Sequence, residues 1–484
     1  MKKIYLIFSL CTTSLYSQIT NPGFELLRDT LPSLPSGWKA RTHDHYSWQV
    51  DSTQSHSGKH SLKIHNELNQ DTLIFSAFSQ VCSIRTTNVK KILLSVYIKT
   101  ENTSRDAGLW CQLWDKNDKT TGFVSLQTLR ITTPRTGNWT KFSLELIINP
   151  EIKKLLFGGF LKGTGTVWYD DFSIEENKLA TSKTAVKFIR NIVDITKRHS
   201  IVADSLNWKT VREDIISIAN GAQTTTQCYE AVNYLIEELR KKGDNHSYFY
   251  PPTFNTKNET INMDGRQPEG RYLGDSTGYI KVPGFMSVHK DTGVRFATRI
   301  QELIKQIDSS NRIVNWIVDL RDNTGGNMYP MIAGLGPLFQ EGILGYFYSP
   351  KNKKESSWFY NNGSAGGGKF SVCKVEKPYL LKHTIPKIIV LTGSNTASSG
   401  EMVVISFKGN KNTSFIGMST AGYSTGNAGH LLSDGSVLNL CESYCRDRNK
   451  TPYYGKIAPD KLIIDELNNR MDTTIEYAKK QFYK

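Results

Sequence analysis

A short stretch near residue 400 combines the residue types of a nucleophile and of a helix start. The stretch LTGSNTASSGEMVV, residues 391–404, has the pattern of a buried strand that runs into a helix. Ser and Thr cap helix N-termini, because their hydroxyls accept the unpaired N–H groups of the first turn. A serine there can also be a nucleophile, since the helix N-terminus stabilises negative charge that develops beside it. By itself the stretch favours the capping interpretation for Thr396, Ser398 and Ser399.

Two further motifs could complete a hydrolytic site. The stretch WIVDLRDNTGGNM ends a buried strand in Gly325 and Gly326, which form either a tight turn or half of an oxyanion hole. A catalytic serine needs a base. His246 lies in the turn GDNHS, whose polar residues could orient an imidazole. The other histidines that follow the β-rich N-terminal part have ordinary polar neighbours, and these are His199, His289, His383 and His430.

Other cofactor motifs are absent from the sequence. GSAGGGKF, residues 363–370, differs from a phosphate-binding loop because Phe370 stands where Ser or Thr would ligate magnesium, and no apolar strand precedes it. We expect a flexible loop there. The sequence has no HExxH and no dinucleotide motif, so we expect no metal or organic cofactor for catalysis.

The composition is that of a globular protein, and the first residues indicate export. Of its 484 residues 38% are hydrophobic, and the net charge of +15 comes from scattered Lys and Arg, which argues against a nucleic-acid partner. Residues 1–17 have two lysines, an apolar run and small polar residues, the pattern of a signal peptide. No later stretch could span a bilayer. We therefore expect a periplasmic or extracellular protein, in which six remaining cysteines could form disulfides.

Residues 18–176 alternate short β-rich runs with turns, which predicts an antiparallel β-sandwich. NPGFE, HSGKHSLKI and GTVWYDDFSI resemble a jelly-roll carbohydrate-binding module. The resemblance implies a glycan partner and a structural calcium held by Glu25 and Asp170. A hydrogen-bonded corner of the sandwich would explain Asp170 equally well. The tryptophans of this segment are more often core residues than sugar platforms.

After residue 176 the spacing of the apolar residues changes from the strand pattern to a helical one. Residues 177–252 contain three amphipathic stretches, which predict a small helical part. Residues 253–484 alternate strands and helices, which predicts an α/β domain with a largely parallel sheet. The chain is thus expected to be a multidomain α/β protein with an N-terminal jelly roll.

Several motifs occur in an order that resembles the C-terminal-processing, or tail-specific, serine peptidases. They are GDNHS, GYIKVPGF, VDLRDNTGG, VLTGSNTASSGE, IGMSTAGYSTGN, LSDGSVLNL and IAPD. The resemblance covers about residues 185–465. It implies that Ser398 is the nucleophile. It also implies that the N–H groups of Ser399 and of the Gly325–Gly326 turn form the oxyanion hole.

The sequence departs from the tail-specific branch at the base. Tyr423 stands where that branch has its catalytic lysine, so this chain is more similar to the lysine-less, tricorn-like branch. That similarity implies His246 as the base and a late acid that orients it, Glu442 or, as we favour, Asp447. Tyr423 is then expected beside the substrate. The regulatory PDZ domain common in the family is missing.

The sequence therefore predicts an exported serine endopeptidase that acts on peptides or proteins through an acyl-enzyme. A histidine base predicts activity that rises with an ionisation near 6 to 7. Two alternatives stay open. The fold could be a catalytically silent binding protein for peptides or glycans, or it could hydrolyse a non-peptide ester or amide.

Overall fold

The computed structural model describes residues 19–28, 35–41, 45–67, 74–176, 179–252, 266–287, 289–383, 385–464 and 472–483. The predicted signal peptide, residues 1–17, lies outside these ranges. The chain forms two compact units, one of Met1–Ile189 with Trp208–Ala231 and the other of Arg190–Asn207 with Val232–Lys484.

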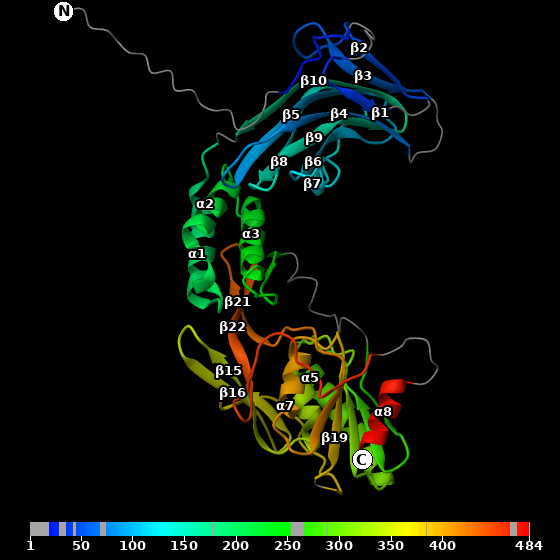
Figure 1. Cartoon of the computed structure of the whole chain (residues 1–484), viewed down its shortest axis with the longest axis vertical. Helices are drawn as coiled ribbons and strands as arrows, with labels where there is room; N and C mark the ends of the chain where they lie inside the picture. The colour runs from blue at the N-terminus through cyan, green and yellow to red at the C-terminus, as the bar shows by residue number, and fades with distance from the viewer. Residues whose placement is uncertain are drawn as a thin grey trace, which may run out of the picture. The chain divides into compact units, whose positions relative to one another are not determined.

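The first unit contains the predicted antiparallel β-sandwich (Figure 1). One sheet has the order β1 (Lys39–Arg41), β4 (Phe75–Ser83), β9 (Lys154–Lys162), β6 (Ala107–Trp114) and β7 (Thr120–Ser125). The other has the order β2 (Ser47–Asp51), β3 (Ser61–Asn66), β10 (Gly165–Glu176), β5 (Lys90–Glu101) and β8 (Gly137–Ile148).

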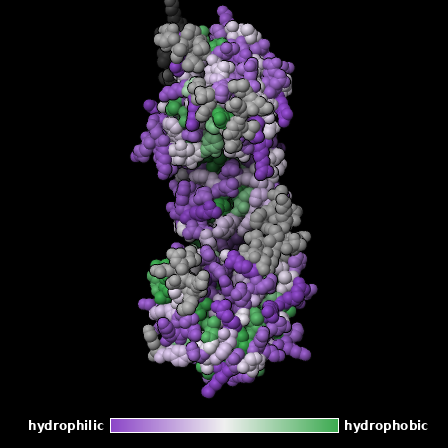
Figure 2. Space-filling view, turned by 90° about the vertical axis from the view of Figure 1, so that its right-hand side faces the viewer, coloured by the Kyte–Doolittle hydropathy of each residue, from purple (hydrophilic) through white to green (hydrophobic). Residues whose placement is uncertain are grey.

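The core of the sandwich follows from period-two patterning. Alternate residues of β5, from Ile92 to Ile98, are buried against the facing sheet. Trp38 packs among Phe78 and Phe172 with ring centroids 5.2 and 4.8 Å away, as expected for a core tryptophan. The face of the molecule in Figure 2 is mainly hydrophilic, with hydrophobic side chains in small patches.

The three predicted amphipathic helices are present. They are α1 (Lys183–His199), α2 (Trp208–Ile218) and α3 (Tyr229–Arg240). Short 3₁₀ turns, Ala203–Ser205 and Thr226–Cys228, lie between them. The two units divide this helical segment, because α2 belongs to the first unit and most of α3 to the second.

The second unit contains the predicted α/β sheet. Its order is β12 (Glu269–Tyr272), β13 (Thr277–Lys281), β14 (Asn315–Asp319), β19 (Lys387–Thr392), β20 (Thr413–Gly417) and β24 (Lys461–Leu462). From β13 onward the pairs are parallel, and only β12 is antiparallel to its neighbour.

Helices cover both faces of this sheet. Trp316 and Val318 of β14 belong to a core that includes residues of α5 (Lys290–Ser310), α6 (Met328–Leu335) and α7 (Ser399–Phe407). Ile317 points to the other face and packs with residues of α8 (Thr473–Gln481), the red helix of Figure 1. Burial on both faces explains the continuous apolar runs of β14 and β19.

A second sheet of this unit was not expected. It is antiparallel and has the order β11 (Tyr248–Tyr250), β22 (Val437–Asp447), β15 (Gly342–Ser349), β16 (Lys354–Asn361), β17 (Ser364–Gly367) and β18 (Phe370–Lys374). Two further strands, β21 (Thr425–Leu431) and β23 (Pro452–Tyr453), pair with β22.

The expectation of a flexible loop at residues 363–370 is wrong, because β17 and β18 form a hairpin there. The glycines serve close packing. A Cβ on Gly366 would lie 1.9 Å from the Phe370 carbonyl oxygen and 2.9 Å from the Phe359 ring.

Within the described ranges, no helix is both long and apolar enough to cross a bilayer. No disulfide joins the six cysteines of the described residues, all of which are buried: Cys82, Cys111, Cys228, Cys373, Cys441 and Cys445.

Candidate active site

Ser398 occupies a sharp turn between a buried strand and a helix. β19 ends at Thr392 and α7 begins at Ser399. The backbone of Ser398 has φ 50° and ψ −120°, a conformation that is costly for a residue with a side chain. Such strain persists only where the surroundings fix it, and a strained strand-to-helix turn is the place where some hydrolases expose a serine hydroxyl. Thr396 holds the turn by donating to the Leu320 carbonyl, 2.8 Å away.

Glu401 joins the Ser398 turn to the loop that contains Tyr423. Its side chain is fully buried, and one oxygen accepts from the backbone N–H groups of Ser398 at 2.9 Å and Tyr423 at 2.7 Å. The other oxygen accepts from the Thr420 hydroxyl at 2.6 Å and the Gly422 N–H at 3.0 Å. Burial raises the pKa of Glu401, while these four donors oppose the shift.

Gly325 and Gly326 lie directly against the serine turn. A Cβ on Gly325 would lie 2.9 Å from the Cβ of Ser398, and both glycines have positive φ, 102° and 107°. Only glycine accepts both constraints without strain. The hydroxyl of Ser399 donates to the Gly326 carbonyl.

Two backbone N–H groups beside Ser398 are available to a ligand. Within the described residues, neither the N–H of Gly326 nor that of Ser399 donates to a protein acceptor. Ser399 is the first residue of α7, where an unpaired N–H is expected. Together they make a candidate oxyanion hole.

His246 is held by its own turn and by β21. Asp244 accepts from the backbone N–H groups of His246 and Ser247, at 3.1 and 2.9 Å. The His246 Nδ1 lies 2.9 Å from the Thr425 hydroxyl, and the ring stacks on Tyr423 with centroids 5.2 Å apart. Nε2 is therefore the ring nitrogen left to meet a serine or a substrate. Burial lowers the pKa of His246 from 6.5 to about 4, although the Asp244 carboxylate opposes the shift.

One pocket of about 1090 Å³ contains both His246 and Ser398 in its lining. Gly326 and Ser399 line it as well. Within the described residues no hydrogen bond joins Ser398 to His246, and such bonds are often long before a substrate binds. The aromatic part of the wall comes from Tyr248, Tyr250, Tyr329 and Phe347.

The sequence of this region matches peptidase family S41 over residues 276–463. This segment is an S41 peptidase domain. Ser398, Gly325, Gly326, Tyr423 and Asp447 lie inside the matched segment, whereas His246 precedes it.

Known proteins are similar to this chain over more than half of its length, beyond the matched segment. The nisin-resistance protein of Lactococcus lactis subsp. lactis is 27% identical over 296 residues, 61% of this chain and 87% of that protein. A lipoprotein from Streptococcus agalactiae is 22% identical, with a TM-score of 0.50 over 63% of this chain and 99% of that one. The photosystem II D1 C-terminal processing protease is 12% identical, with a TM-score of 0.41 over 58% of this chain and 94% of that one.

The S41 domain does not bring Asp447 to His246, which corrects the expected acid partner. Asp447 accepts from the backbone N–H groups of Asn449 and Thr451 and from the Tyr453 hydroxyl. These bonds close the turn after β22. The hydroxyl of Thr425 occupies the position at Nδ1 that a carboxylate was expected to hold.

Thr425 and Glu401 are the residues that sequence reasoning missed. Glu401 had a signal, since Ser398 and Glu401 have the Ser-x-x-Glu spacing of a capping box. Thr425 had none, because only the pairing of β21 with β22 brings it to a histidine 179 positions away.

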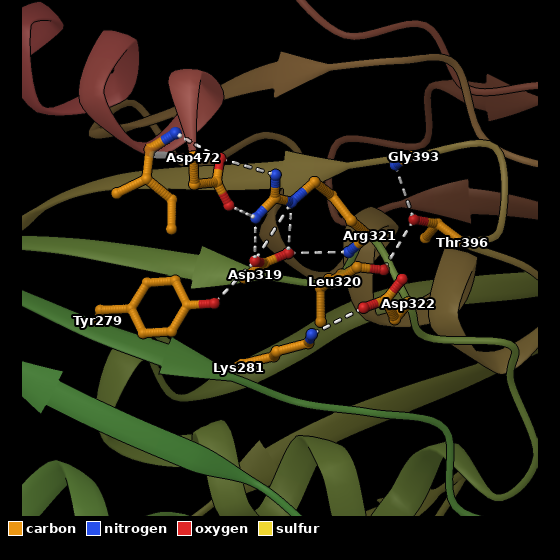
Figure 3. A network of polar contacts seen from close by, with 10 residues as sticks. Tyr279, Lys281, Asp319, Leu320, Arg321, Asp322, Gly393, Thr396 and Asp472 are labelled. Atoms are coloured by element: carbon orange, nitrogen blue, oxygen red, sulfur yellow. Dashed lines mark hydrogen bonds and ion pairs between the residues drawn. The ribbon is translucent and has the colours of Figure 1, made fainter. Parts of the chain in front are cut away.

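A polar network holds the strand end that precedes the two glycines. Figure 3 shows the Arg321 guanidinium between Asp319 and Asp472, with its shortest bonds at 2.6 Å to Asp319 and 2.5 Å to Asp472. Tyr279 donates to Asp319 at 2.8 Å, and Lys281 pairs with Asp322 at 2.7 Å. A network of paired charges around the buried Asp319 rigidifies this strand end.

In the sandwich, Glu25 and Asp170 both accept N–H groups from residues 56–60. Asp170 accepts from His56 and Ser57 at 2.7 and 3.1 Å, and Glu25 accepts from Lys59 and His60 at 2.8 and 3.1 Å. Burial raises the pKa of Asp170 to about 6 against these donors. Both carboxylates thus serve as hydrogen-bond acceptors at this corner of the sandwich. Calcium binding at Glu25 and Asp170 stays a prediction, which melting with and without a chelator tests.

Proposed function

We propose that this chain is an exported serine peptidase that cleaves peptide bonds through an acyl-enzyme formed on Ser398. The observation that carries the proposal is the strained turn of Ser398 at the start of α7, in a pocket that His246 also lines. The S41 domain supports it at the level of the family.

In the proposed reaction His246 Nε2 takes the hydroxyl proton of Ser398 as the serine oxygen attacks the peptide carbonyl. The carbonyl oxygen becomes negatively charged and accepts from the N–H groups of Gly326 and Ser399. The imidazolium then gives its proton to the leaving amine. Water hydrolyses the acyl-enzyme by the same steps.

Thr425 favours one tautomer of the proposed base, because its hydroxyl donates to the Asn427 Oδ1 at 3.4 Å and can then accept from Nδ1. With Nδ1 protonated and donating to the Thr425 hydroxyl, Nε2 carries the free lone pair. A hydroxyl orients the ring but adds no negative charge, which agrees with the low pKa of His246. The proposed base is therefore neutral and ready over the physiological pH range.

The pocket is large enough for several residues of an extended peptide. Its volume of about 1090 Å³ is at the upper end of ordinary ligand sites. Tyrosine rings offer apolar surface for side chains. Because one relative is a nisin-resistance protein, nisin is one peptide to test as a substrate.

Labelling with a fluorophosphonate probe tests the proposal. We expect the wild-type chain to be labelled at Ser398, and the Ser398→Ala and His246→Ala variants not to be. Folded wild-type protein that neither reacts with the probe nor cleaves a peptide library would favour the silent, peptide-binding alternative. Cleavage of esters but no peptides would favour the other alternative.

A second candidate function, glycan binding, has its own supporting observation in the sandwich. A pocket of about 590 Å³ on the sheet that contains β4, β6, β7 and β9 is lined by Phe75, Trp110, Phe123 and Phe160. Within the described residues, the Trp110 Nε1 and the Gln127 Oε1 are buried without a hydrogen-bond partner. Unpaired polar atoms among aromatic rings suit a sugar, which offers hydroxyls and apolar faces. A glycan array with a Trp110→Ala control tests this.

Export is proposed from residues 1–17 together with the lipoprotein relative. Fractionation of cells that produce the full chain tests it. Protein that stays in the cytoplasm with residues 1–17 uncleaved would contradict export.

A further inference from the structure

Three side chains of types that can bind metals meet at the edge of the candidate active site. His199 ends α1, His430 lies on β21 and Glu442 on β22. One ligand atom from each lies within 4.8 Å of the other two. In the part of the chain that the structure describes, this is the one group of three such residues that could share an ion.

The distances suit a small divalent cation. The Glu442 Oε1 lies 3.3 Å from the His199 Nδ1 and 2.6 Å from the His430 Nε2. Ligands about 2.0–2.1 Å from zinc in a tetrahedron are about 3.3 Å apart. The Glu442–His199 pair already has this separation, and the Glu442–His430 pair needs to open by about 0.7 Å, which rotation of a partly exposed side chain supplies.

The backbone around the three residues is fixed before any ion binds. Beyond the end of α1, the Ile201 N–H donates to the Cys441 carbonyl at 3.0 Å, which ties this segment to β22. Glu442 is the extra residue where the register of β21 and β22 shifts opposite Gly426 and Asn427. Such bulges re-aim side chains next to functional sites.

We propose that His199, His430 and Glu442 bind one divalent cation of the zinc, cobalt and nickel class. Two imidazoles and one carboxylate are ligands these ions accept, and three protein ligands leave a coordination position open. Glu442 also lines the pocket of the proposed catalytic residues, so the open position lies at the pocket edge. The site goes beyond the proposed peptidase reaction, which needs no metal.

Calorimetric titration of Zn²⁺ into the chelator-treated, untagged full chain tests the proposal. We expect one ion per chain in the wild type and at least tenfold weaker binding in His430→Asn and in Glu442→Gln. His383→Ala removes an exposed histidine outside the group and should bind like the wild type. Near-ultraviolet circular dichroism checks that each variant is folded.

Cobalt provides a second measurement that identifies the ligands. We expect visible bands of a four- or five-coordinate cobalt site without the charge-transfer band of a thiolate, because no cysteine belongs to the group. A wild type that binds no zinc, or that binds it no more tightly than both folded variants, would overturn the proposal. A thiolate band would do the same.

Discussion

The sandwich pocket and the pocket of Ser398 have similar aromatic walls but differ in how their polar groups are bonded. In the sandwich pocket the Trp110 Nε1 and the Gln127 Oε1 are left without protein partners. In the S41 domain the polar groups around Ser398 are tied down, above all by the four bonds to Glu401. Under the two proposed functions, unpaired polar groups of the sandwich pocket would serve a ligand, whereas the groups around Ser398 would be fixed before the substrate arrives.

The largest expected effect is a loss of peptide hydrolysis on substitution in the Ser398 pocket but not in the sandwich pocket. We expect Ser398→Ala and His246→Ala each to lower kcat/KM for a peptide by about 10³-fold or more, because nucleophile and base act as one unit. Trp110→Ala in the sandwich should leave kcat/KM within about twofold. Steady-state kinetics on one fluorogenic peptide measures all three. A large loss in folded Trp110→Ala would show that the sandwich takes part in hydrolysis.

Removing the support of the serine turn should have the next largest effect. Glu401→Ala leaves buried N–H groups unpaired, so we expect kcat to fall about 10²-fold with little change in KM, and the free energy of unfolding to fall by about 1–3 kcal/mol. Glu401→Gln should recover part of kcat. Glu302→Gln, an exposed carboxylate on α5, is the matched control. A rise in KM with kcat unchanged would mean that Glu401 serves substrate binding.

The corrected partner of His246 can be tested with a pair of variants. Thr425→Val removes the hydroxyl at Nδ1, and we expect kcat/KM to fall about tenfold because the tautomer is no longer fixed. Asp447→Asn should leave the ionisation of His246 unchanged, since Asp447 bonds within its own turn. The pH profile of each variant is the measurement. A shifted ionisation in Asp447→Asn alone would restore Asp447 as the acid partner.

Because the pKa of His246 is about 4, we expect activity to persist to lower pH than the ionisation near 6 to 7 that the sequence predicts. With a pKa of about 4 the imidazole is unprotonated above about pH 5, so kcat/KM should be nearly constant from pH 7 to 5.5 and half its plateau near pH 4. An unperturbed histidine would already lose about nine tenths of the activity at pH 5.5. Measurements in buffers of constant ionic strength distinguish the two.

The smallest effect concerns stability, where the two regions should respond to acid with opposite sign. His246 has a folded pKa below its unfolded value, so acidification from pH 6.5 to 4 favours unfolding of the second unit. Asp170 has a folded pKa of about 6, above its unfolded value. Its contribution therefore makes the sandwich more stable as the pH falls from 6 to 4. One pKa unit corresponds to about 1.4 kcal/mol, and 1 kcal/mol shifts Tm by about 2–4 °C, so we expect changes in Tm of several degrees.

Calorimetry of the wild type against His246→Gln and Asp170→Asn isolates each contribution. The pH dependence of the difference from wild type should have opposite slopes for the two variants. Slopes of the same sign would contradict the assignment for one of the two groups.

Local patterns in the sequence determined much of this protein. Period-two runs predicted the sandwich, and apolar runs before Gly325 and Ser398 predicted the parallel strands that present them, since burial on one or both faces leaves a direct mark on residue order. The order of short motifs led to Ser398 and His246, which the fold then placed in one pocket.

Tertiary structure alone decided the partners of those residues. Thr425 reaches His246, and His199 reaches His430 and Glu442, only through strand pairing and helix packing across long stretches of chain. Asp447 has the residue type and the late position expected of the acid partner of His246. Its carboxylate instead accepts hydrogen bonds from the turn after β22. Hydrogen bonds are directional and short, so their partners depend on register and bulges that residue order alone does not reveal.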